Sequence, residues 1–331
     1  MIRPATVLIL LLTLRGATLG EPVAEIHYIM GTYFRISADG GKPSATRAAM
    51  RRCFRQTRSL EALFSRFDAA SELNRINHDT SPELPISRDM AALLTQATRL
   101  TLATDGTFDV AAGALTALWR GAEQWPGDEA IRNAKRLVGE EAFRVRGRRL
   151  LRRPGVRLDL DGIAKGYAVD LCAEQLRQHG VDSALLNLGE SSLYGLGAPR
   201  GAKDWEVTLR DLNGDGALGT IRLRDQALSV SAVFGHEHRI GTQRVGHIID
   251  PRNGRPLTTA ALAAVVMPSA TAAEAWSKAV LIEGELKTFA TRNRRAGALL
   301  VRPGTFAKTG RISFQRAPVV REITASEEPL R

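Results

Sequence analysis

The pattern of hydrophobic and polar positions divides the chain into helices and strands that do not alternate regularly. Apolar residues at helical spacing predict amphipathic helices, at 44–64, 87–103, 127–138 and 271–282. Period-two alternation between turn signals predicts strands, at 26–37, 184–188, 205–209, 219–223, 227–233, 244–249, 261–267 and 298–302, with a short hairpin at 143–151. Because strands and helices are not regularly interleaved, the pattern indicates an α+β fold and not a doubly wound sheet.

The middle of the chain carries the most specific pattern, a strand that leads directly into a helix. Alternation through 156–160 predicts a strand that ends at Asp161, and a helical apolar stripe follows over 163–176. Lys165 falls in the first turn of this helix, where free N–H groups and the helix dipole favour an anion. The segment could therefore seat a phosphate, although a lysine at a helix start is more often simply solvated.

The first twenty residues have the outline of a secretory signal peptide. A positively charged N-terminal region is followed by an apolar run over 5–14 and small residues at 17–20. The apolar run is shorter than a transmembrane helix requires. No lipoprotein cysteine follows, and no other stretch is apolar enough to span a bilayer. We therefore expect residues 1–20 to be removed (with cleavage after 24 as an alternative), residues 21–324 to form one domain, and residues 325–331 to be a disordered tail. The mature protein is expected in the periplasm.

Charge and cysteine content narrow the possible partners. The net charge is +11, and the leader contains two of the arginines and no acidic residue. The remaining arginines are dispersed and are not interleaved with aromatic residues, which argues against nucleic acid as a partner. Cys53 and Cys172 both fall on predicted helices. In an exported protein they could form a disulfide, but two buried thiols are equally compatible with the sequence.

Some motifs resemble binding sites but fail on context. Residues 214–219 have the spacing G-x-G-x-x-G, but a predicted strand follows, whereas the dinucleotide fingerprint must open a helix. Residues 211–216 resemble the start of a calcium loop, but Arg222 stands where a bidentate glutamate is required. The His-Glu-His segment at 236–238 would place two imidazoles on one strand face, with His247 near in sequence, but a zinc site would still need a third ligand. We expect none of them to be a site.

Further sequence blocks accompany residues 161–170 in a fixed order along nearly the whole mature chain. They are Met-Gly-Thr at 30–32, Phe-Ser-Arg-Phe-Asp at 64–68 with Ser-Glu-Leu-Asn-Arg-Ile-Asn at 71–77, Asp-Gly-Thr-Phe-Asp at 105–109, Val-Gly-His-Ile-Ile-Asp-Pro-Arg-Asn-Gly-Arg-Pro at 245–256, and Ala-Glu-Ala-Trp-Ser-Lys-Ala-Val-Leu-Ile-Glu-Gly at 273–284. Together these blocks resemble the ApbE family of FAD:protein FMN transferases.

The resemblance implies an exported enzyme with a T-fold-like α+β domain of mixed sheets and packed helices. In that family, magnesium helps to split the pyrophosphate of FAD. FMN then passes to a serine or threonine hydroxyl of an acceptor protein, and AMP leaves. The implied partners are FAD and exported acceptor proteins of membrane redox complexes.

The resemblance also assigns roles to individual positions. The expected FAD contacts are Met30, Phe67, Thr107, Phe108, Asp109, Asp161, Lys165 and His247. The expected catalytic residues are His247, Lys165 and Asp250, and the backbone carbonyl of Ala164 is an expected metal ligand. Cleaving a pyrophosphate requires positive charge at the leaving oxygens and a base for the incoming hydroxyl. His247 is the candidate base, with a loop-orienting role as the alternative.

The last block departs from the family at its metal site. The family carries Asp and Thr four residues apart, on one helix face, where their oxygens converge on the cation. The matching positions here are Glu274 and Lys278, and an ammonium cannot ligate a metal. Two local interpretations compete with metal chemistry: a capping box from Thr271 to Glu274, and an i,i+4 ion pair between Glu274 and Lys278. A third is that Lys278 occupies the magnesium position as a built-in cation.

These departures leave alternative functions open. The family's Thr-Ser-Gly is replaced by Val-Ser-Ala at 230–232, and its Gly-Gly-Asp by Gly-Glu-Ser at 189–191. One alternative is a non-catalytic FAD-binding protein that has lost the magnesium site. Another is an FAD pyrophosphatase.

Overall fold

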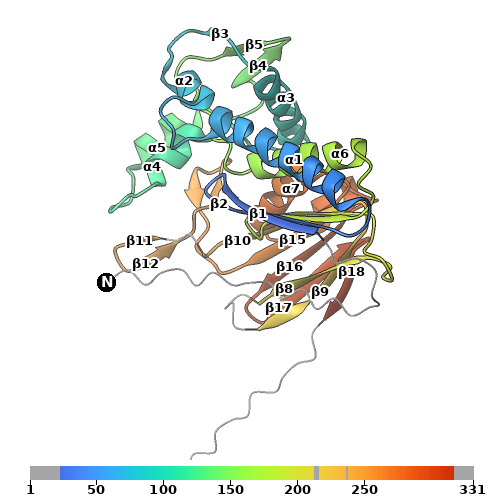
Figure 1. Cartoon of the computed structure of the whole chain (residues 1–331). Coiled ribbons are helices and arrows are strands. Elements are labelled where there is room, and N and C mark those ends of the chain that lie inside the picture. Colours follow the sequence, from blue (N-terminus) through green and yellow to red (C-terminus); the bar gives the residue numbers. More distant parts are fainter. Residues whose placement is uncertain (1–22, 212–215, 236–237, 317–331) are drawn as a thin grey trace, which may run out of the picture.

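An eight-stranded antiparallel sheet forms the middle layer of the molecule in a computed structural model that describes residues 23–211, 216–235 and 238–316 (Figure 1). The expected signal peptide and C-terminal tail lie outside the described residues. In spatial order the strands are β1 (Val23–Ile29), β2 (Thr32–Ala38), β6 (Ala184–Leu188), β7 (Ser192–Leu196), β10 (Gln226–Ala232), β15 (Leu262–Met267), β16 (Gly297–Arg302) and β17 (Thr305–Gly310).

The two faces of this sheet are covered by different layers (Figure 1). Helices α1 (Pro43–Phe64), α6 (Ala164–Gln178) and α7 (Ala270–Glu283) cover one face, and a small sheet of β18 (Ser313–Arg316), β9 (Ala217–Leu223) and β8 (Trp205–Arg210) covers the other. Successive residues of a strand serve opposite faces: Ala263 and Val265 enter the helix-side core, whereas Ala264 and Val266 enter the core beneath the small sheet. The expected α+β class is confirmed.

The remaining elements lie outside the large sheet and its two covering layers. They are helices α2 (Glu72–His78), α3 (Arg88–Ala103), α4 (Gly113–Trp119), α5 (Asp128–Lys135) and α8 (Lys287–Arg292), the sheet of β3 (Glu83–Pro85), β5 (Arg149–Arg152) and β4 (Phe143–Arg146), and the short pairs β11 (His238–Ile240) with β12 (Gln243–Val245) and β13 (Ile249–Asp250) with β14 (Arg255–Pro256). The α4 and α5 helices build a third small core with the segment around β13.

Three of the strand predictions need correction. The strand expected over 26–37 is the β1–β2 hairpin. Its two-residue turn at Met30 (φ 56°) and Gly31 (φ 71°) has positive φ at both positions, as a type I′ turn requires. Residues 156–160 are extended but join no sheet, with a single bridge between Ala112 and Arg157. The strand expected over 244–249 is divided between β12 and β13. Strand β7 was not predicted, and neither were helices α2, α4 and α8.

The capping-box prediction for α7 is also wrong. The N-cap residue is Ser269, whose side-chain oxygen accepts from the Ala272 N–H. Thr271 lies inside the first turn and donates its hydroxyl to Asp170 at 2.6 Å. Asp170 belongs to α6, so a carboxylate from a neighbouring helix satisfies the start of α7 in place of Glu274.

Cys53 and Cys172 form a disulfide that joins α1 to α6, with their Cα atoms 5.0 Å apart. Both cysteines lie on helices, as expected, and the choice that the sequence left open is resolved in favour of the disulfide. The bond connects the helix that follows the first hairpin to the helix that carries Lys165 in its first turn.

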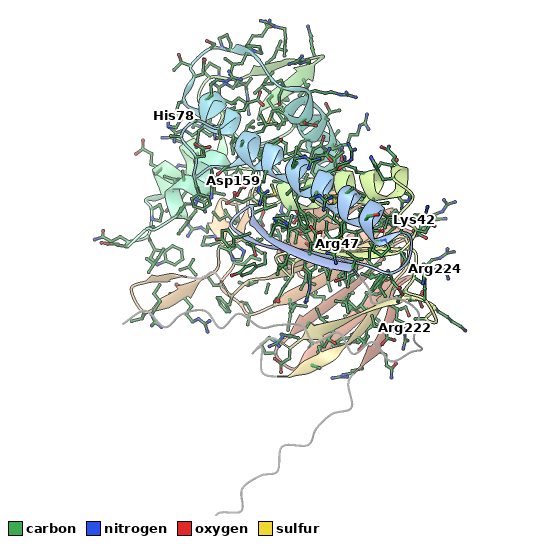
Figure 2. The ribbon with its side chains drawn as sticks, viewed as in Figure 1. Lys42, Arg47, His78, Asp159, Arg222 and Arg224 are labelled. Atoms are coloured by element: carbon green, nitrogen blue, oxygen red, sulfur yellow. A yellow bond between two sulfur atoms is a disulfide. The ribbon has the colours of Figure 1, made fainter. Side chains whose placement is uncertain are left out.

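Basic side chains are spread over separate parts of the surface. Lys42 and Arg47 lie at the start of α1, whereas Arg222 and Arg224 lie at the end of β9, in the small sheet (Figure 2). Within the described residues, no helix has both the length and the apolar character needed to cross a membrane.

Candidate functional site

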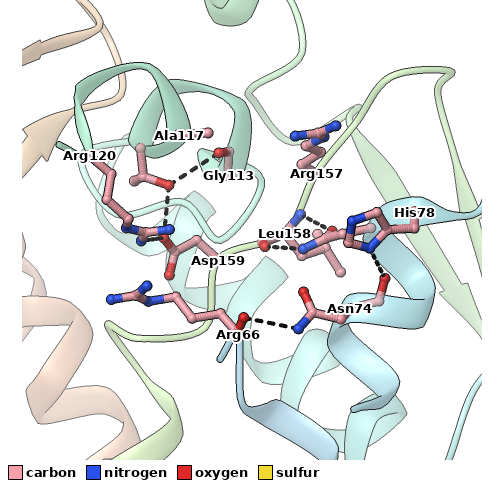
Figure 3. Close-up of a pocket in the computed structure, with 11 residues that line it drawn as sticks. Arg66, Asn74, His78, Gly113, Ala117, Arg120, Arg157, Leu158 and Asp159 are labelled. Carbon is pink, nitrogen blue, oxygen red and sulfur yellow. Dashed lines mark hydrogen bonds and ion pairs between the residues drawn. The ribbon is translucent and has the colours of Figure 1, made fainter. Parts of the chain in front are cut away.

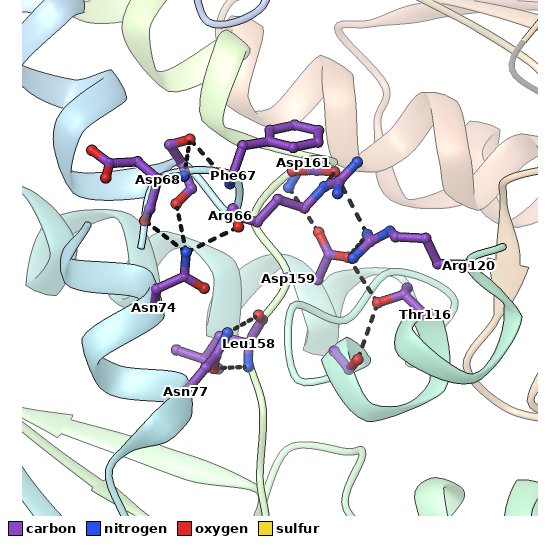
Figure 4. Close-up of polar contacts among 12 residues, drawn as sticks. Arg66, Phe67, Asp68, Asn74, Asn77, Thr116, Arg120, Leu158, Asp159 and Asp161 are labelled. Atoms are coloured by element: carbon purple, nitrogen blue, oxygen red, sulfur yellow. Dashed lines mark hydrogen bonds and ion pairs between the residues drawn. The ribbon is translucent and has the colours of Figure 1, made fainter. Parts of the chain in front are cut away.

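The extended segment 157–159 delivers the chain to the start of α6, and side chains and backbone from two neighbours hold it. Asn77 of α2 donates to the Leu158 carbonyl at 2.8 Å and accepts from the Leu158 N–H at 2.7 Å (Figure 4). On the other side, the Gly113 N–H donates to the Arg157 carbonyl at 3.1 Å. A Cβ at Gly113 would lie 2.6 Å from that carbonyl oxygen, so the close approach requires glycine.

Helix α6 begins with the predicted lysine and touches α7 closely. The Lys165 ammonium donates to the Ser191 hydroxyl at 2.6 Å. A Cβ at Gly166 would lie 2.5 Å from the Ala270 carbonyl oxygen, so this glycine allows the two helices to meet. One turn later, Asp170 accepts from the backbone N–H groups of Ala270 and Thr271 at 2.6 and 2.9 Å. Helix α6 thereby sets the position of α7.

Glu274 and Lys278 of α7 lie beside this helix start. Glu274 is 1% exposed; one carboxylate oxygen accepts from Ser192, and the other has no hydrogen-bond partner within the part of the chain that the structure describes. The Lys278 ammonium donates to the backbone carbonyl of Glu274 at 3.1 Å, so the expected ion pair with the carboxylate is not formed as a contact. The lysine stem passes over the α6 start: a Cβ at Gly162 would lie 3.2 Å from Lys278 Cε and 3.3 Å from the Phe108 ring.

Four charged side chains therefore gather at this point. Burial lowers the pKa of Lys278, and the nearby Lys165 lowers it further, whereas Glu274 and Asp161 act in the opposite direction. The geometry agrees, because the Lys278 stem crosses Gly162, the residue after Asp161, and Lys165 lies in the first turn of α6. The result is a mixed-charge cluster at the start of α6.

The residues at the expected metal position do not fit magnesium. The resemblance assigns a backbone carbonyl at Ala164 and side chains at Glu274 and Lys278. The carbonyl and the carboxylate are oxygen donors of the kind that Mg²⁺ prefers. The ammonium has three N–H donors and no acceptor, and it repels a cation. Elsewhere in the described residues, no group of three or more His, Cys, Asp or Glu side chains is arranged to hold a metal.

An arginine–aspartate network borders the cluster. Arg66 donates to Asp161, and Arg120 donates to Asp159 at 3.0 Å and lies 3.8 Å from Asp161 (Figure 4). Partial burial raises the pKa of Asp161, and the Asp159 carboxylate raises it further, against the lowering effects of the two arginines. The Arg66 guanidinium also stacks on Phe67, 3.7 Å from the ring centroid.

Phe67 is 78% exposed, an unusual environment for a large aromatic ring. Its guanidinium neighbour is bonded to Asp161, so the ring is tied to the start of α6. An exposed aromatic ring at this place can serve as a stacking surface for a planar ligand.

A small pocket is lined in part by Arg66 and Arg120. Its volume is about 140 Å³, and its lining includes Arg66, Arg120, Arg157, His78 and Asp159 (Figure 3). Ligand pockets for drug-sized molecules measure about 300–1,000 Å³. The pocket is therefore too small for a dinucleotide, although it shares Arg66 and Arg120 with the network at Asp161.

Apart from His247, the remaining predicted FAD contacts are one residue at the hairpin tip and three residues in a loop. Met30 occupies the β1–β2 turn and donates its N–H to Glu61 at 2.6 Å. The same hairpin approaches Lys165, since Thr32 packs against Gly189, two residues before the serine that binds the lysine.

The loop residues beside Phe108 have their polar groups engaged within the protein. Thr107 is 1% exposed and donates its hydroxyl to the Thr104 carbonyl at 2.7 Å. Asp109 accepts from the N–H groups of Ala111 and Gly139 at 2.8 and 2.7 Å, and burial raises its pKa. These two residues hold the loop in place, and Phe108 faces Gly162 at the cluster.

The predicted catalytic loop is attached to the site through α4. His247 is exposed and lies between β12 and β13, while Asp250 is 6% exposed and accepts from the Arg252 guanidinium through two bonds of 3.0 Å. The Trp119 indole N–H donates to the Gly254 carbonyl at 2.7 Å, which seats the loop on α4. Arg120, the next residue, binds Asp159. Within the loop, the carboxylate of Asp250 holds the turn that follows it through its bonds with Arg252.

Several residues of the site were not assigned from the sequence: Arg66, Asn77, Arg120, Asp159, Asp170, Ser191 and Ser192. Asn77 and Arg66 lie within the sequence blocks that carry the family resemblance. The blocks draw attention to these two positions but do not indicate which residues they contact. Ser191 occupies a position where this chain departs from the family pattern.

The protein has an α+β fold, and its candidate site combines a lysine at a helix start with carboxylates and an exposed aromatic ring. Such a combination can bind a phosphorylated aromatic ligand. Comparison with known proteins places the chain in the ApbE family, which matches residues 30–300.

Relatives and solved structures agree with this membership. The chain is similar to the FAD:protein FMN transferases of Klebsiella pneumoniae (28% identity, 78% of this chain and 77% of the relative) and Salmonella typhimurium (29% identity, 82% and 81%). Its fold is similar to that of the ApbE protein from Thermotoga maritima (TM-score 0.78, 24% identity, 90% and 97% of the two chains) and of the flavin transferase ApbE from Vibrio cholerae (0.75, 23%, 87% and 96%).

Proposed function

We propose that this protein is an FAD:protein FMN transferase, which moves FMN from FAD to a serine or threonine hydroxyl of an exported acceptor protein. Membership of the ApbE family and the names of the similar relatives support the activity. The observation that carries the proposal is the cluster at the start of α6, where Lys165 and Lys278 lie beside Asp161. Two ammonium groups at a helix start suit the diphosphate of FAD.

The reaction breaks one bond of the pyrophosphate and makes one phosphoester bond. The acceptor hydroxyl oxygen attacks the phosphorus of the FMN half, the bond from that phosphorus to the bridging oxygen breaks, and AMP leaves with the bridging oxygen. The hydroxyl proton passes to a base, for which the exposed His247 is the candidate. Lys165 would stabilise negative charge that develops on the phosphate oxygens. Asp250 would act by holding the His247 loop.

Aromatic and apolar side chains would bind the planar parts of FAD. Phe67 is the most exposed of them, Phe108 lies against Gly162, and Met30 occupies the hairpin tip. Thr107 and Asp109 would contribute by fixing the loop that carries Phe108. Because the residues at the expected magnesium position do not fit the ion, no step of this mechanism is assigned to a metal.

The proposed setting is the periplasm, after removal of residues 1–20, with residues 21–324 as the functional domain. The signal-like start of the chain supports this setting. The acceptor would be an exported domain of a membrane redox complex.

An assay of flavin attachment tests the proposal. The purified mature protein is incubated with FAD and an exported flavin-acceptor domain, covalent FMN is measured by in-gel fluorescence and mass spectrometry, and AMP is measured by chromatography. We expect covalent FMN and AMP in equal amounts. His247→Ala should slow transfer strongly, whereas the matched control His179→Ala, at an exposed position at the end of α6, should not.

The same assay separates the alternatives. FAD that stays bound without AMP release would favour a non-catalytic FAD-binding protein, the candidate supported by Lys278 at the metal position. AMP with free FMN would indicate an FAD pyrophosphatase. Either result would overturn the transferase proposal.

A further inference from the structure

The two lysines of the cluster come from different helices and keep donors available for a ligand. Lys165 uses one N–H bond on Ser191, and Lys278 uses one on the Glu274 carbonyl. An ammonium has three N–H donors. Within the described residues, each lysine therefore retains two donors that no protein acceptor takes.

Each carboxylate of the cluster accepts a hydrogen bond from a residue other than Lys278, although the second oxygen of Glu274 has no partner within the described residues. Asp161 accepts from Arg66 and has Arg120 at 3.8 Å, and Glu274 accepts from Ser192. Neither carboxylate makes a salt bridge with Lys278 among the described residues. The positive charge of Lys278 is thus not cancelled by a direct ion pair, and it remains available to an anion at the α6 start.

The position of Lys278 is fixed by its surroundings. Its aliphatic stem lies across Gly162, where any side chain would press on the stem and on the Phe108 ring. Its ammonium is held by a backbone carbonyl one turn earlier in its own helix. Because both the aliphatic stem and the ammonium group of Lys278 are already held, the side chain loses little conformational entropy when it binds an anion.

We infer that Lys278 is a built-in replacement for the divalent cation, so that this protein binds the diphosphate of FAD through Lys165 and Lys278 without a metal. The inference rests on the proposed function for the identity of the ligand. Lys278 supplies charge only: it exchanges no proton and forms no bond with the transferred group. Metal-independent FMN transfer would follow, with the same bonds made and broken as above.

FAD binding measured with and without magnesium tests the inference separately from catalysis. The full mature protein is titrated with FAD, followed by flavin fluorescence and calorimetry, in EDTA and in Mg²⁺. We expect the same Kd in both buffers for the unchanged protein. Lys278→Met, which keeps the stem but removes the charge, should lose about tenfold in affinity, equivalent to about 1.4 kcal/mol, in both buffers.

Three further variants sharpen the test. Lys278→Arg should retain metal-independent binding because it keeps the charge. The double variant Glu274→Asp with Lys278→Thr restores oxygen ligands, and its FAD affinity should become dependent on Mg²⁺. Lys287→Met, at an exposed position of α8, is the matched control and should bind FAD as the unchanged protein does. Near-ultraviolet circular dichroism of each variant checks that the fold is retained.

The possible failures are distinguishable. A clear gain in FAD affinity of the unchanged protein on adding Mg²⁺, or unchanged binding by Lys278→Met, would overturn the inference. FAD binding that is metal-independent but never followed by FMN transfer would leave the inference standing and overturn the proposed function. FMN transfer that occurs only with Mg²⁺ would support the proposed function and overturn the inference.

Discussion

Asn77 satisfies two backbone groups that segment 157–159 would otherwise leave without a sheet partner. Its amide both donates to and accepts from Leu158, across a sequence separation of 81 residues. A buried backbone group without a partner costs about 1–3 kcal/mol. This one side chain therefore substitutes for a neighbouring strand in holding the segment that leads to Asp161.

Asn77→Ala should accordingly destabilise the protein by about 1–3 kcal/mol. Urea unfolding measures the loss, and FAD affinity should fall in parallel because the start of α6 loses its anchor. Asn133→Ala, at an exposed position of α5, is the control and should change stability by no more than about 0.5 kcal/mol. Equal stability of the two variants would show that Asn77 does not hold the segment.

Asp109 provides a prediction with a definite pH dependence. Burial raises its folded pKa above the usual 3.8, so the folded state binds the proton more tightly than the unfolded state does. The stability from this preference is present below the unfolded pKa and is lost as the pH rises through the folded pKa. The stability of the Asp109→Asn variant does not fall with pH in this way, because asparagine does not titrate. The variant is less stable at every pH, however, because asparagine has one acceptor oxygen fewer than aspartate.

We therefore expect the stability deficit of Asp109→Asn, measured by urea unfolding, to shrink as the pH rises from 3.8. Glu129→Gln, at an exposed position of α5, should show no comparable trend. A deficit that grows with pH would mean that the hydrogen bonds from Ala111 and Gly139 outweigh burial and lower the pKa.

The residues that could be assigned from the sequence are those whose role depends on local position. Lys165 was predicted at a helix start because the helix and its first turn can be derived from one short window. The partners of Arg66 and Asn77 lie 95 and 81 residues away. No local pattern encodes such a pair, since it depends on how segments far apart in the sequence pack against each other.

At the scale of elements, most predicted helices and strands lie close to the observed bounds, and the failures have local causes. The helix expected over 87–103 is α3, which begins after the Ser87 cap. The strand expected over 26–37 failed because its alternation continues through the turn, and Met30 is not a residue that normally indicates positive φ. Residues 156–160 alternate as a strand does, but side-chain hydrogen bonds replace strand pairing there.

The disulfide between α1 and α6 should contribute substantially to stability. Cys53 and Cys172 are separated by 119 positions, so the bond restricts a long loop of the unfolded chain. Bonds of this kind typically contribute about 2–4 kcal/mol. Reductant should therefore lower the urea midpoint of the unchanged protein, and the double variant Cys53→Ala with Cys172→Ala should match the reduced protein.

The double variant also serves as the control for this measurement, because reductant has no bond to cleave in it. If reductant left the unchanged protein as stable as before, the pair would not be a stabilising disulfide. FAD affinity of the reduced protein should fall less than its stability, since no cysteine belongs to the charge cluster.

At the scale of the whole molecule, the candidate site lies on the helix side of the large sheet and draws on separate parts of the chain. The charge cluster belongs to α6 and α7, whereas the His247 loop belongs to the small core at α4 and α5. Trp119 connects them: its indole binds the loop at Gly254, and the adjacent Arg120 binds Asp159. Trp205 makes a similar bond to the Leu196 carbonyl, at 3.0 Å, in the core beneath the small sheet.

These two tryptophans form a matched pair for testing whether the His247 loop must be held against the cluster. Each is 2% exposed, and each phenylalanine variant leaves one buried carbonyl without its indole donor, at a cost of about 1–3 kcal/mol. We expect Trp119→Phe and Trp205→Phe to lose similar stability in urea. Only Trp119→Phe should slow FMN transfer, with FAD affinity nearly unchanged, because Lys165 and Lys278 stay in place. If both variants slowed transfer equally, general destabilisation would explain the effect, and the α4 connection would have no part in positioning the loop.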